Sequence, residues 1–344
     1  MTPAVTETKL RPVRRAPLIG ALVTASALLL LAAVLSLLIG ARVLSLREML
    51  GGLTGTDHVA SAIIWQLRLP RTVVGLVVGA ALGAAGVLAQ AVTRNPLADP
   101  GLLGISAGAA VAIVAGSVMF GVGGGVPRVL LAIAGAAVAT ALVYLFAHRA
   151  PDGLTPVNMT LAGMAVTACL GGVVSGIVLF SASTMDQYRF WVVGALSIPH
   201  ANVLIPAGAA VLVGAGIALV VAGALDALAL GDDAAAALGV HVVRTRLLTG
   251  VAVVLLSGAA VAVSGPIGFV GLIVPHAVRM LVGGDVRRAL ALSAIVGPLL
   301  LLAADVIGRV VVRPAELQVG VVTALVGTPV FIWLTRRTRA GSRS

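Results

Sequence analysis

Charged residues are scarce in this 344-residue chain. Only 10% of its residues are Asp, Glu, Lys or Arg, whereas 60% are hydrophobic and the mean hydropathy is +1.13. A soluble domain carries about 25% charged residues, so the composition excludes a water-soluble globular fold. The single cysteine, Cys169, excludes an internal disulfide and a multi-cysteine metal site. It lies in an apolar run, where we predict a small packing residue.

Acidic residues are the rarer charged type, with 12 Asp and Glu against 23 Lys and Arg and a net charge of +11. In a membrane protein, such an excess is explained by basic residues that stay on the cytoplasmic side near anionic lipid. We therefore expect these basic residues to contact membrane lipid and not nucleic acid.

Long stretches without any charge predict the membrane spans, because one charge at mid-bilayer costs about 2.5–3.5 kcal/mol on insertion scales. A crossing helix needs roughly 17–25 residues. Ser264-Gly265-Pro266 interrupts the stretch 247–278 and allows two short passes to meet there. The charge-free stretches are residues 16–41, 72–93, 100–127, 129–148, 153–185, 190–225, 247–278, 289–304 and 317–335.

Clusters of basic residues at both ends of the chain place both termini in the cytoplasm and therefore require an even number of crossings. We predict an all-α integral membrane protein with about ten transmembrane helices. Its parts are a cytoplasmic tail at 1–15, a transmembrane domain at 16–335 and a second cytoplasmic tail at 336–344. The first span is expected to be a retained helix, because its uncharged run is longer than that of a signal peptide.

Ionisable groups are missing from the centres of the predicted spans. Asp305 and Gln90 lie near span ends, where we expect water to solvate them. An ion-coupled carrier needs such groups as its coupling machinery, so this class is disfavoured. The chain also lacks a P-loop Lys-Ser/Thr motif, so we expect no catalysis by this chain. Two functional classes remain: a passive channel, and a conduit driven by another subunit.

Three patterns stand out within and between the spans. Gly75, Gly79 and Gly83 recur every four residues on one helix face, which favours close helix packing. Proline and glycine are dense in two connecting segments, where they mark either gating breaks or simple span ends. The residues concerned are Asn95 and Pro96 in the first segment, and Gly265, Pro266, Gly268, Pro275 and His276 in the second. A metal ligand role for His276 is disfavoured, because no second ligand is spaced with it.

Arginines occur on the predicted outer side, where the positive-inside rule disfavours them. Arg68 and Arg71 flank Pro70, and Arg309 follows Asp305 at the outer end of a later span. These arginines either contact lipid headgroups beside a helix boundary set by Pro70, or dock carboxylates of an extracytoplasmic partner.

The stretch from Leu225 to Arg246 is too polar to cross the membrane and is predicted to form two short helices on the cytoplasmic side. Asp232 and Asp233 are expected to supply a helix N-cap and a favourable charge, and Gly239 fits the helix stop. The stretch is either an ordinary interfacial helix or a rigid knob that transmits motion from a cytoplasmic motor.

Five segments follow one another from about Trp65 to the C-terminus. They are RLPRTVVGLVVGAALGAAGVLAQ, RNPLADPGLLGISAGA, LGDDAAAALGV, SGPIGFVGLIVPHAVRML and ELQVGVVTALVGTPVFIWL. Together they resemble the permease subunits of ABC importers for ferric siderophores, haem and cobalamin, the FecCD-like type II importer permeases. Arg94, Ala236 and Ala237 depart from the usual residues of that family.

The resemblance implies ten transmembrane helices, a second permease subunit that is a copy or a sister chain, a cytoplasmic ABC ATPase dimer and an extracytoplasmic substrate-binding protein. It further implies that Arg68, Arg71 and Arg309 pair with acidic residues of the binding protein. The segment Gly231–Gly239 matches the coupling helices that contact the ATPase, and coupling is assigned to Gly231, Asp232, Asp233, Ala234, Leu238 and Gly239.

The expected function is that of a cell-membrane permease subunit in an ATP-driven importer for a ferric siderophore. We expect no cofactor and no resident metal. A haem or cobalamin permease of the same family and an ion-coupled carrier are the alternatives.

Overall fold

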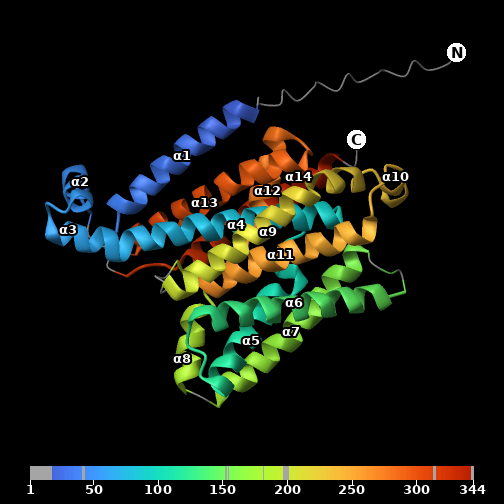
Figure 1. The fold of residues 1–344 in the computed structure, drawn as a ribbon, viewed down its shortest axis with the longest axis horizontal. Coiled ribbons are helices and arrows are strands. Elements are labelled where there is room, and N and C mark those ends of the chain that lie inside the picture. Colours follow the sequence, from blue (N-terminus) through green and yellow to red (C-terminus); the bar gives the residue numbers. More distant parts are fainter. Residues whose placement is uncertain are drawn as a thin grey trace.

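The computed structural model describes residues 18–40, 43–151, 153, 155–180, 182–196, 201–312 and 315–341, and the regular elements in these ranges are all helices (Figure 1). Seven helices are long and apolar enough to cross a membrane. They are α1 (Leu18–Leu38), the run His58–Thr93 that ends in α4 (Leu69–Thr93), α6 (Gly125–Arg149), α7 (Pro156–Leu179), α9 (Ala201–Leu228), α11 (Val242–Ser264) and α13 (Val286–Val311).

Three shorter apolar helices complete the bundle: α5 (Ile105–Phe120), α12 (Val270–Val282) and the apolar part, Val319–Ile332, of α14 (Val319–Gly341). With the seven longer ones, they make ten apolar helices in the described ranges, which confirms the prediction of about ten. Short helices connect them: α2 (Leu46–Thr54), α3 (His58–Ala62), α8 (Ala182–Trp191), α10 (Asp232–Ala237) and the 3-10 turn Pro100–Leu103.

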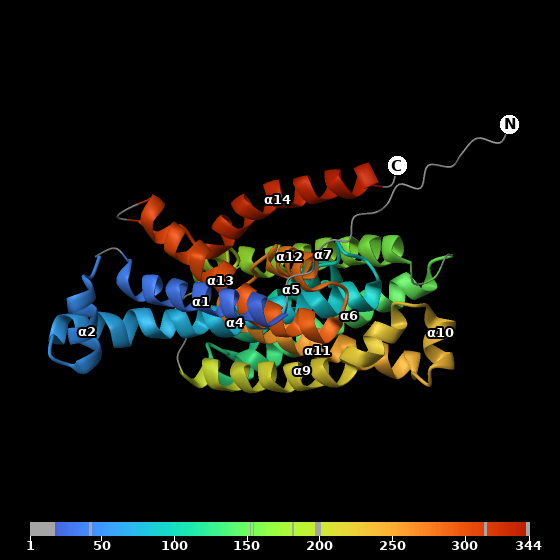
Figure 2. The ribbon, with the colours of Figure 1, turned by 90° about the horizontal axis from the view of Figure 1, so that it is seen from above.

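The two termini of the described chain lie at the same end of the bundle. Figure 2 shows the start of α1 and the end of α14 at the end that carries α10, whereas α2 and the start of α4 lie at the other end. This arrangement agrees with an even number of crossings. Helix α14 continues through Gly341 into the predicted tail 336–344, and the predicted tail 1–15 lies outside the described residues.

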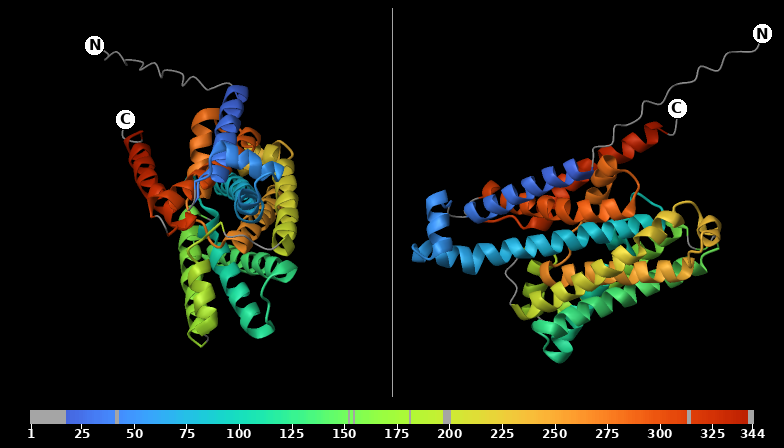
Figure 3. Two further views of the ribbon diagram at one scale, coloured as in Figure 1. Left: turned by 90° about the vertical axis from the view of Figure 1, so that its left-hand side faces the viewer. Right: turned by 45° about the horizontal axis from the view of Figure 1, so that its top comes forward.

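Helix α4 forms the centre of the bundle, with α1 and α13 on one side and the pair α5–α6 on the other (Figure 3). Its three spaced glycines lie against α13. A Cβ on Gly79 would lie 2.5 Å from the Cα of Pro298, and one on Gly83 would lie 2.7 Å from the carbonyl oxygen of Ser293. A Cβ on Gly75 would meet the Leu302 side chain at 2.6 Å. The glycines thus permit contact between the two helices.

Pro70 does not begin a new helix, as one interpretation of RLPR suggested. Helix α3, a π-helical segment from Ile63 to Arg68, and α4 form one continuous helical run. Pro70 lies in the first turn of α4. Its missing backbone N–H costs least at this position, because the hydrogen bonds of the preceding π-helical segment end here.

Two helices are short because proline- and glycine-rich segments precede them. At 1.5 Å per residue, the 16 residues of α5 and the 13 residues of α12 reach only about 24 and 20 Å. The stretch 247–278 does contain two helices, as its Ser264-Gly265-Pro266 break allowed. Only the second is short, because α11 has 23 residues.

Candidate functional site

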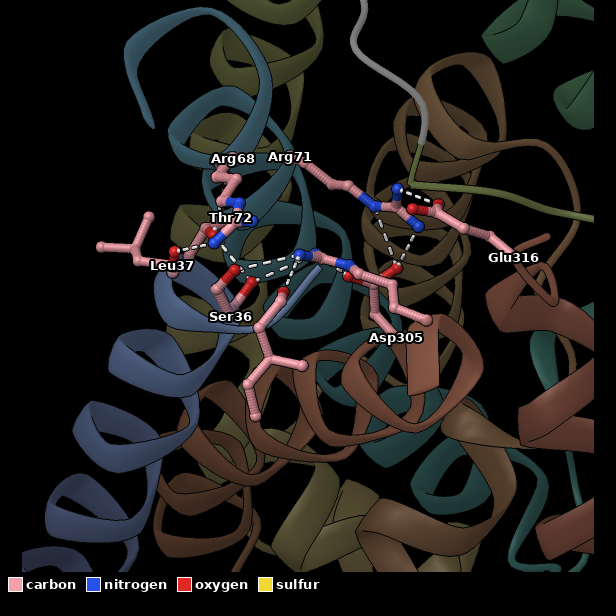
Figure 4. A network of polar contacts seen from close by, with 9 residues as sticks. Ser36, Leu37, Arg68, Arg71, Thr72, Asp305 and Glu316 are labelled. Carbon is pink, nitrogen blue, oxygen red and sulfur yellow. Dashed lines mark hydrogen bonds and ion pairs between the residues drawn. The ribbon is translucent and has the colours of Figure 1, made fainter. Parts of the chain in front are cut away.

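Charged side chains from α4, α13 and the segment before α14 meet at the end of the bundle opposite α10 (Figure 4). Arg71 donates from Nε and Nη2 to Asp305 Oδ1, at 3.0 and 2.7 Å, and from Nη1 to Glu316 Oε2 at 2.6 Å. Arg309 Nη2 donates to the other carboxylate oxygen of Asp305. One carboxylate therefore holds two arginines, and we call Arg68, Arg71, Asp305, Arg309 and Glu316 the outer charge network.

Most of this network is buried. The exposed fraction is 0% for Asp305, 2% for Arg309 and 6% for Arg68. The prediction that Asp305 is solvated was therefore wrong: it lies inside the bundle, where the two arginines replace water as its partners. The full burial of Gln90, 1% exposed, contradicts the same prediction at the other end of α4.

Arg68 and Arg309 hold the C-terminal end of α1. Arg309 Nη1 donates to the carbonyl oxygens of Ser36 and Ile39, at 2.9 and 3.1 Å, and Arg68 Nη1 donates to that of Leu37 at 2.5 Å. The last carbonyls of a helix have no partner within the helix, and cations there also favour the helix dipole. Sequence reasoning missed this role, because α1 is far from both arginines along the chain.

Of the three arginines predicted to dock a partner, only Arg71 leaves part of its side chain open, with 21% exposed. Its neighbour Glu316 is 37% exposed. The guanidinium groups of Arg68 and Arg309 donate to backbone carbonyl oxygens at the end of α1. Docking by these two arginines stays a prediction, and their burial does not favour it.

At the opposite end, α10 projects from the bundle between α9 and α11. The stretch Leu225–Arg246 contains one short helix and not the predicted two, because α9 continues to Leu228 and α11 already begins at Val242. Gly231, with a φ of 115°, is the N-cap and gives no side-chain capping bond. Asp232 and Asp233 therefore lie in the first turn and not at the cap, where their charge still favours the helix dipole.

Asp232 ties α10 to two other helices. It accepts a hydrogen bond at 3.0 Å from Arg246 on α11, and it forms an ion pair with Arg94, the residue that ends α4. The remaining predicted coupling residues that are exposed at this end are Asp233, Ala234, Leu238 and Gly239. The ion pairs connect an exposed helix directly to the central helix of the bundle.

Gln90 replaces a helical donor that proline removes. Pro275 has no N–H for the carbonyl oxygen of Gly271, one helical turn earlier. Gln90 Nε2 lies 3.4 Å from that oxygen and 3.2 Å from the carbonyl oxygen of Leu272. Arg279 Nη1 donates to Gln90 Oε1 at 3.0 Å, and half-buried His276 lies on the same helix. A buried amide thus stabilises α12 at Pro275, and the helix continues from Val270 to Val282.

The two proline-rich segments meet inside the bundle. In the first, Asn95 Oδ1 accepts a bond from the Leu97 N–H at 2.9 Å, which forms a turn at Pro96. Asp99 Oδ1 accepts one from the Gly101 N–H at 2.7 Å. Burial of the Asp99 carboxyl group raises its pKa, and the bond from Gly101 opposes that rise. A Cβ on Gly271 would lie 3.1 Å from Asp99 Oδ2, so the segments are in contact.

The second segment carries unusual backbone angles. Gly265 has a φ of 70°, and a Cβ there would lie 2.2 Å from the carbonyl oxygen of Trp191. Phe269 has a φ of 67°, which is costly for a residue with a Cβ. Its ring lies against Gly327 of α14, where a Cβ would be 2.5 Å from Phe269 Cγ. In contrast, a Cβ on Gly268 would meet no atom within 4 Å.

Cys169 is exposed on α7 and does not pack in the interior as predicted. Within the ranges that the structure describes, no group of three or more His, Cys, Asp or Glu side chains is arranged to hold a metal ion.

Comparison with known proteins gives consistent matches over most of the chain. A model of the FecCD transport family matches residues 28–337. The ferric enterobactin transport system permease protein of Escherichia coli K12 is 47% identical, covering 92% of this chain and 95% of that protein. The hemin transport system permease protein of Yersinia pestis is 37% identical, covering 91% and 94%. The vitamin B12 import system permease protein of Vibrio cholerae is 37% identical, covering 80% and 83%.

A solved structure has the same fold. It is assigned to the metal-chelate type of ABC transporter and was captured in an inward-facing conformation. It superposes with a TM-score of 0.81 at 31% identity, covering 93% of this chain and 99% of that one.

Proposed function

Because the chain belongs to the FecCD transport family and is a multi-pass permease subunit of an ABC importer in the cell membrane, we propose that its cargo is a ferric siderophore. One observation carries this proposal: identity to the ferric enterobactin permease is 47%, against 41% for the cobalamin permease of Halobacterium salinarum and 37% for the hemin permease. ATP is hydrolysed by a separate ATPase subunit in this family. Membership also implies a substrate-binding protein and a second permease subunit.

The cargo is tested by reconstituting the permease with its ATPase in liposomes and adding its binding protein loaded with one ligand at a time. We expect ATP-dependent uptake of iron from a ferric siderophore and no uptake of haem or cobalamin. Uptake of haem or cobalamin without siderophore uptake would overturn the cargo while leaving the family assignment intact.

We propose that Arg71 binds a carboxylate of the binding protein. It is the arginine of the outer charge network with an exposed side chain, and it lies at the end of the bundle opposite α10. A guanidinium group suits paired binding of a carboxylate, and an incoming acidic side chain would compete with Glu316 for Nη1. Asp305 and Arg309 hold Arg71 in place, while Arg68 and Arg309 fix α1 beside it.

Arg71→Gln removes the guanidinium group and its positive charge without adding a buried like charge, so the fold should persist with Asp305 still held by Arg309. We expect capture of the loaded binding protein by the permease in nanodiscs to weaken by about tenfold or more. Arg189→Gln is the matched control, because Arg189 is an exposed arginine at the same end of the bundle. Equal capture by the two variants would reject docking at Arg71.

We propose that α10 receives the motion of the ATPase and passes it to α4 and α11. Exposed Asp233, Ala234 and Leu238 offer a small contact surface, and Asp232 connects this surface to Arg94 and Arg246. Ion pairs of this kind can move the attached helices together with α10, and the variants that test this role are described below.

We also propose that the second permease subunit packs along α14. An open, largely apolar groove there is lined by Val193, Gly320, Val321, Ala324, Leu325, Thr328 and Pro329. In a Cys169→Ala background, we expect Leu325→Cys to form a disulfide-linked dimer in membranes. Leu219→Cys, exposed on α9, should not. A dimer of this chain linked through Leu325→Cys would identify a homodimer. Cross-linking at both positions would contradict this interface, as would cross-linking at neither in membranes where this chain is the only permease subunit and supports uptake.

A further inference from the structure

A small cavity is lined by residues of α5, α6 and α8 and of the segment between α5 and α6. Helix α8 lies at the end of the bundle opposite α10 (Figure 1). The volume of the cavity is about 70 Å³. That is roughly the share of liquid volume that two water molecules occupy, so it accommodates one small polar group. The polar side chains that line it are Ser117, Arg128, Thr184, Gln187, Tyr188 and Trp191.

Two of the residues that line this cavity each carry a buried donor without an acceptor. The Nε of Arg128 and the Nε1 of Trp191 are both buried without a hydrogen-bond partner among the described residues. Both atoms can donate and neither can accept. A buried donor left unpaired costs about 1–3 kcal/mol, and more when it is charged. The pair therefore calls for an acceptor oxygen.

The charge of Arg128 is also uncompensated. It forms no ion pair with any described residue, whereas Arg189, on nearby α8, is paired with Asp186. Arg128 lies in the first turn of α6, where the helix dipole disfavours a cation. The carbonyl oxygens of Gly116 and Ser117 at the end of α5 already accept bonds from backbone N–H groups. An acceptor that fits this site is therefore an anionic one.

The surface beside the cavity is apolar. Val118, Met119 and Phe120 at the end of α5, and Val126 and Leu130 on α6, are all exposed. Tyr188 and Trp191 are the residue types that favour the headgroup level of a bilayer. Acyl chains would cover these apolar side chains, whereas an acidic loop of a soluble partner would not.

We propose that this cavity binds the phosphate group of a phospholipid in the leaflet opposite α10. The phosphate oxygens accept hydrogen bonds from Arg128 and from the Trp191 indole, and the acyl chains lie along α5 and α6. Free phosphate shares this chemistry, so the test must distinguish the two sources.

Trp191 reports on its own site once the other two tryptophans are replaced, as in Trp65→Phe with Trp333→Phe. We expect dihexanoyl-phosphatidylglycerol, added to the purified full chain in detergent, to change Trp191 fluorescence until the site saturates. Arg128→Gln should weaken this binding by at least about tenfold, because it removes hydrogen bonds from a charged donor. Arg128→Lys keeps the charge and should weaken binding less. Arg189→Gln is the matched control and should bind as the parent does.

A second measurement does not depend on fluorescence. Native mass spectrometry should find phospholipid retained by the parent chain and by Arg189→Gln, and less retained by Arg128→Gln and by Trp191→Phe. Equal retention by all four would overturn the proposal. Saturation by inorganic phosphate as tight as by the lipid would overturn the lipid assignment. Weaker capture of the binding protein by Arg128→Gln, with lipid retention unchanged, would place a protein carboxylate here instead.

Discussion

At the residue scale, Asp305 decides how the outer end of the bundle is held together. Its two oxygens accept bonds from Arg71 and Arg309, and Arg309 in turn holds the end of α1 through Ser36 and Ile39. Removing one partner of a buried ion pair is costly because the remaining charge is left unpaired in a medium of low dielectric constant. The stability of this end therefore depends on one carboxylate.

Asp305→Asn keeps the shape of the side chain and removes its charge. We expect it to lower the free energy of unfolding by about 3–5 kcal/mol, because Arg309 then lacks a counter-charge. Asp186→Asn is the matched control, since Asp186 pairs with Arg189 at an exposed site, where such a pair contributes about 0–1 kcal/mol. Denaturant unfolding of both variants in the same detergent measures the difference, and equal losses would contradict the role of Asp305.

The sequence predicted this end of the molecule only in part. Three arginines on the predicted outer side indicated a site, because the positive-inside rule disfavours basic residues on that side. Their partners were not predictable, because Leu37 and Ser36 accept through backbone oxygens and any residue type supplies those. The predicted docking role requires exposed arginines. Arg68 and Arg309 instead lie inside the bundle and donate to backbone carbonyl oxygens at the end of α1.

At the scale of elements, contact between α4 and α13 depends on glycine. The backbone of Pro298 occupies the space that a Cβ on Gly79 would need, so the two helix axes approach closely. Membrane helices associate through this kind of packing, because lipid provides no hydrophobic driving force between them.

Gly79→Ala should therefore lower the free energy of unfolding by about 1–3 kcal/mol, the usual cost of overpacking. Gly250→Ala on α11 is the matched control, because a Cβ there meets no atom within 4 Å. It should be neutral or stabilising, since alanine favours helix over glycine by about 1 kcal/mol. Thermal unfolding of both variants in detergent distinguishes them, and a Gly79→Ala chain as stable as the parent would refute the contact.

Helix α10 offers a matched pair of carboxylates for the coupling proposal. Asp232 pairs with Arg94 and Arg246, whereas Asp233 is exposed and adds charge to the same helical turn. We expect Asp232→Asn to lower the cargo moved per ATP hydrolysed by about two- to fivefold, as the loss of exposed ion pairs permits. Asp233→Asn should stay near the parent value. Uptake and ATPase rates from the same proteoliposomes give the ratio, and identical ratios would refute the link.

Helix count and helix breaks differ in how far sequence predicts them. Nine charge-free stretches, one of them divisible at its break, predicted about ten helices once both termini were placed on the same side, because the need to avoid charge in lipid acts on each segment separately. The break at Ser264-Gly265-Pro266 was visible as well. The support of α12 at Pro275 was not, because Gln90 reaches the carbonyl oxygens of Gly271 and Leu272 from a helix far away in sequence. Asp232 was placed at a cap for a similar reason: glycine gives no capping side chain to recognise.

At the scale of the whole molecule, the two ends of the bundle differ in kind. One end carries the outer charge network with Arg71 at its surface, and the other carries α10, tied by ion pairs to the central helix α4. Membership in the FecCD family implies two partners that this single chain does not contain, an ATPase and a binding protein. The central claim is that this chain is a conduit without an energy source of its own.

Uptake of ferric siderophore into proteoliposomes, with an uncoupler present throughout, tests this claim most directly. The account predicts accumulation when the permease, the ATPase, the loaded binding protein and ATP are all present, and none when the ATPase or ATP is left out. Accumulation against a gradient by this chain alone would contradict it, as would a complete absence of uptake by the full system while ATP is maintained, if the same system accumulates the siderophore once the uncoupler is omitted.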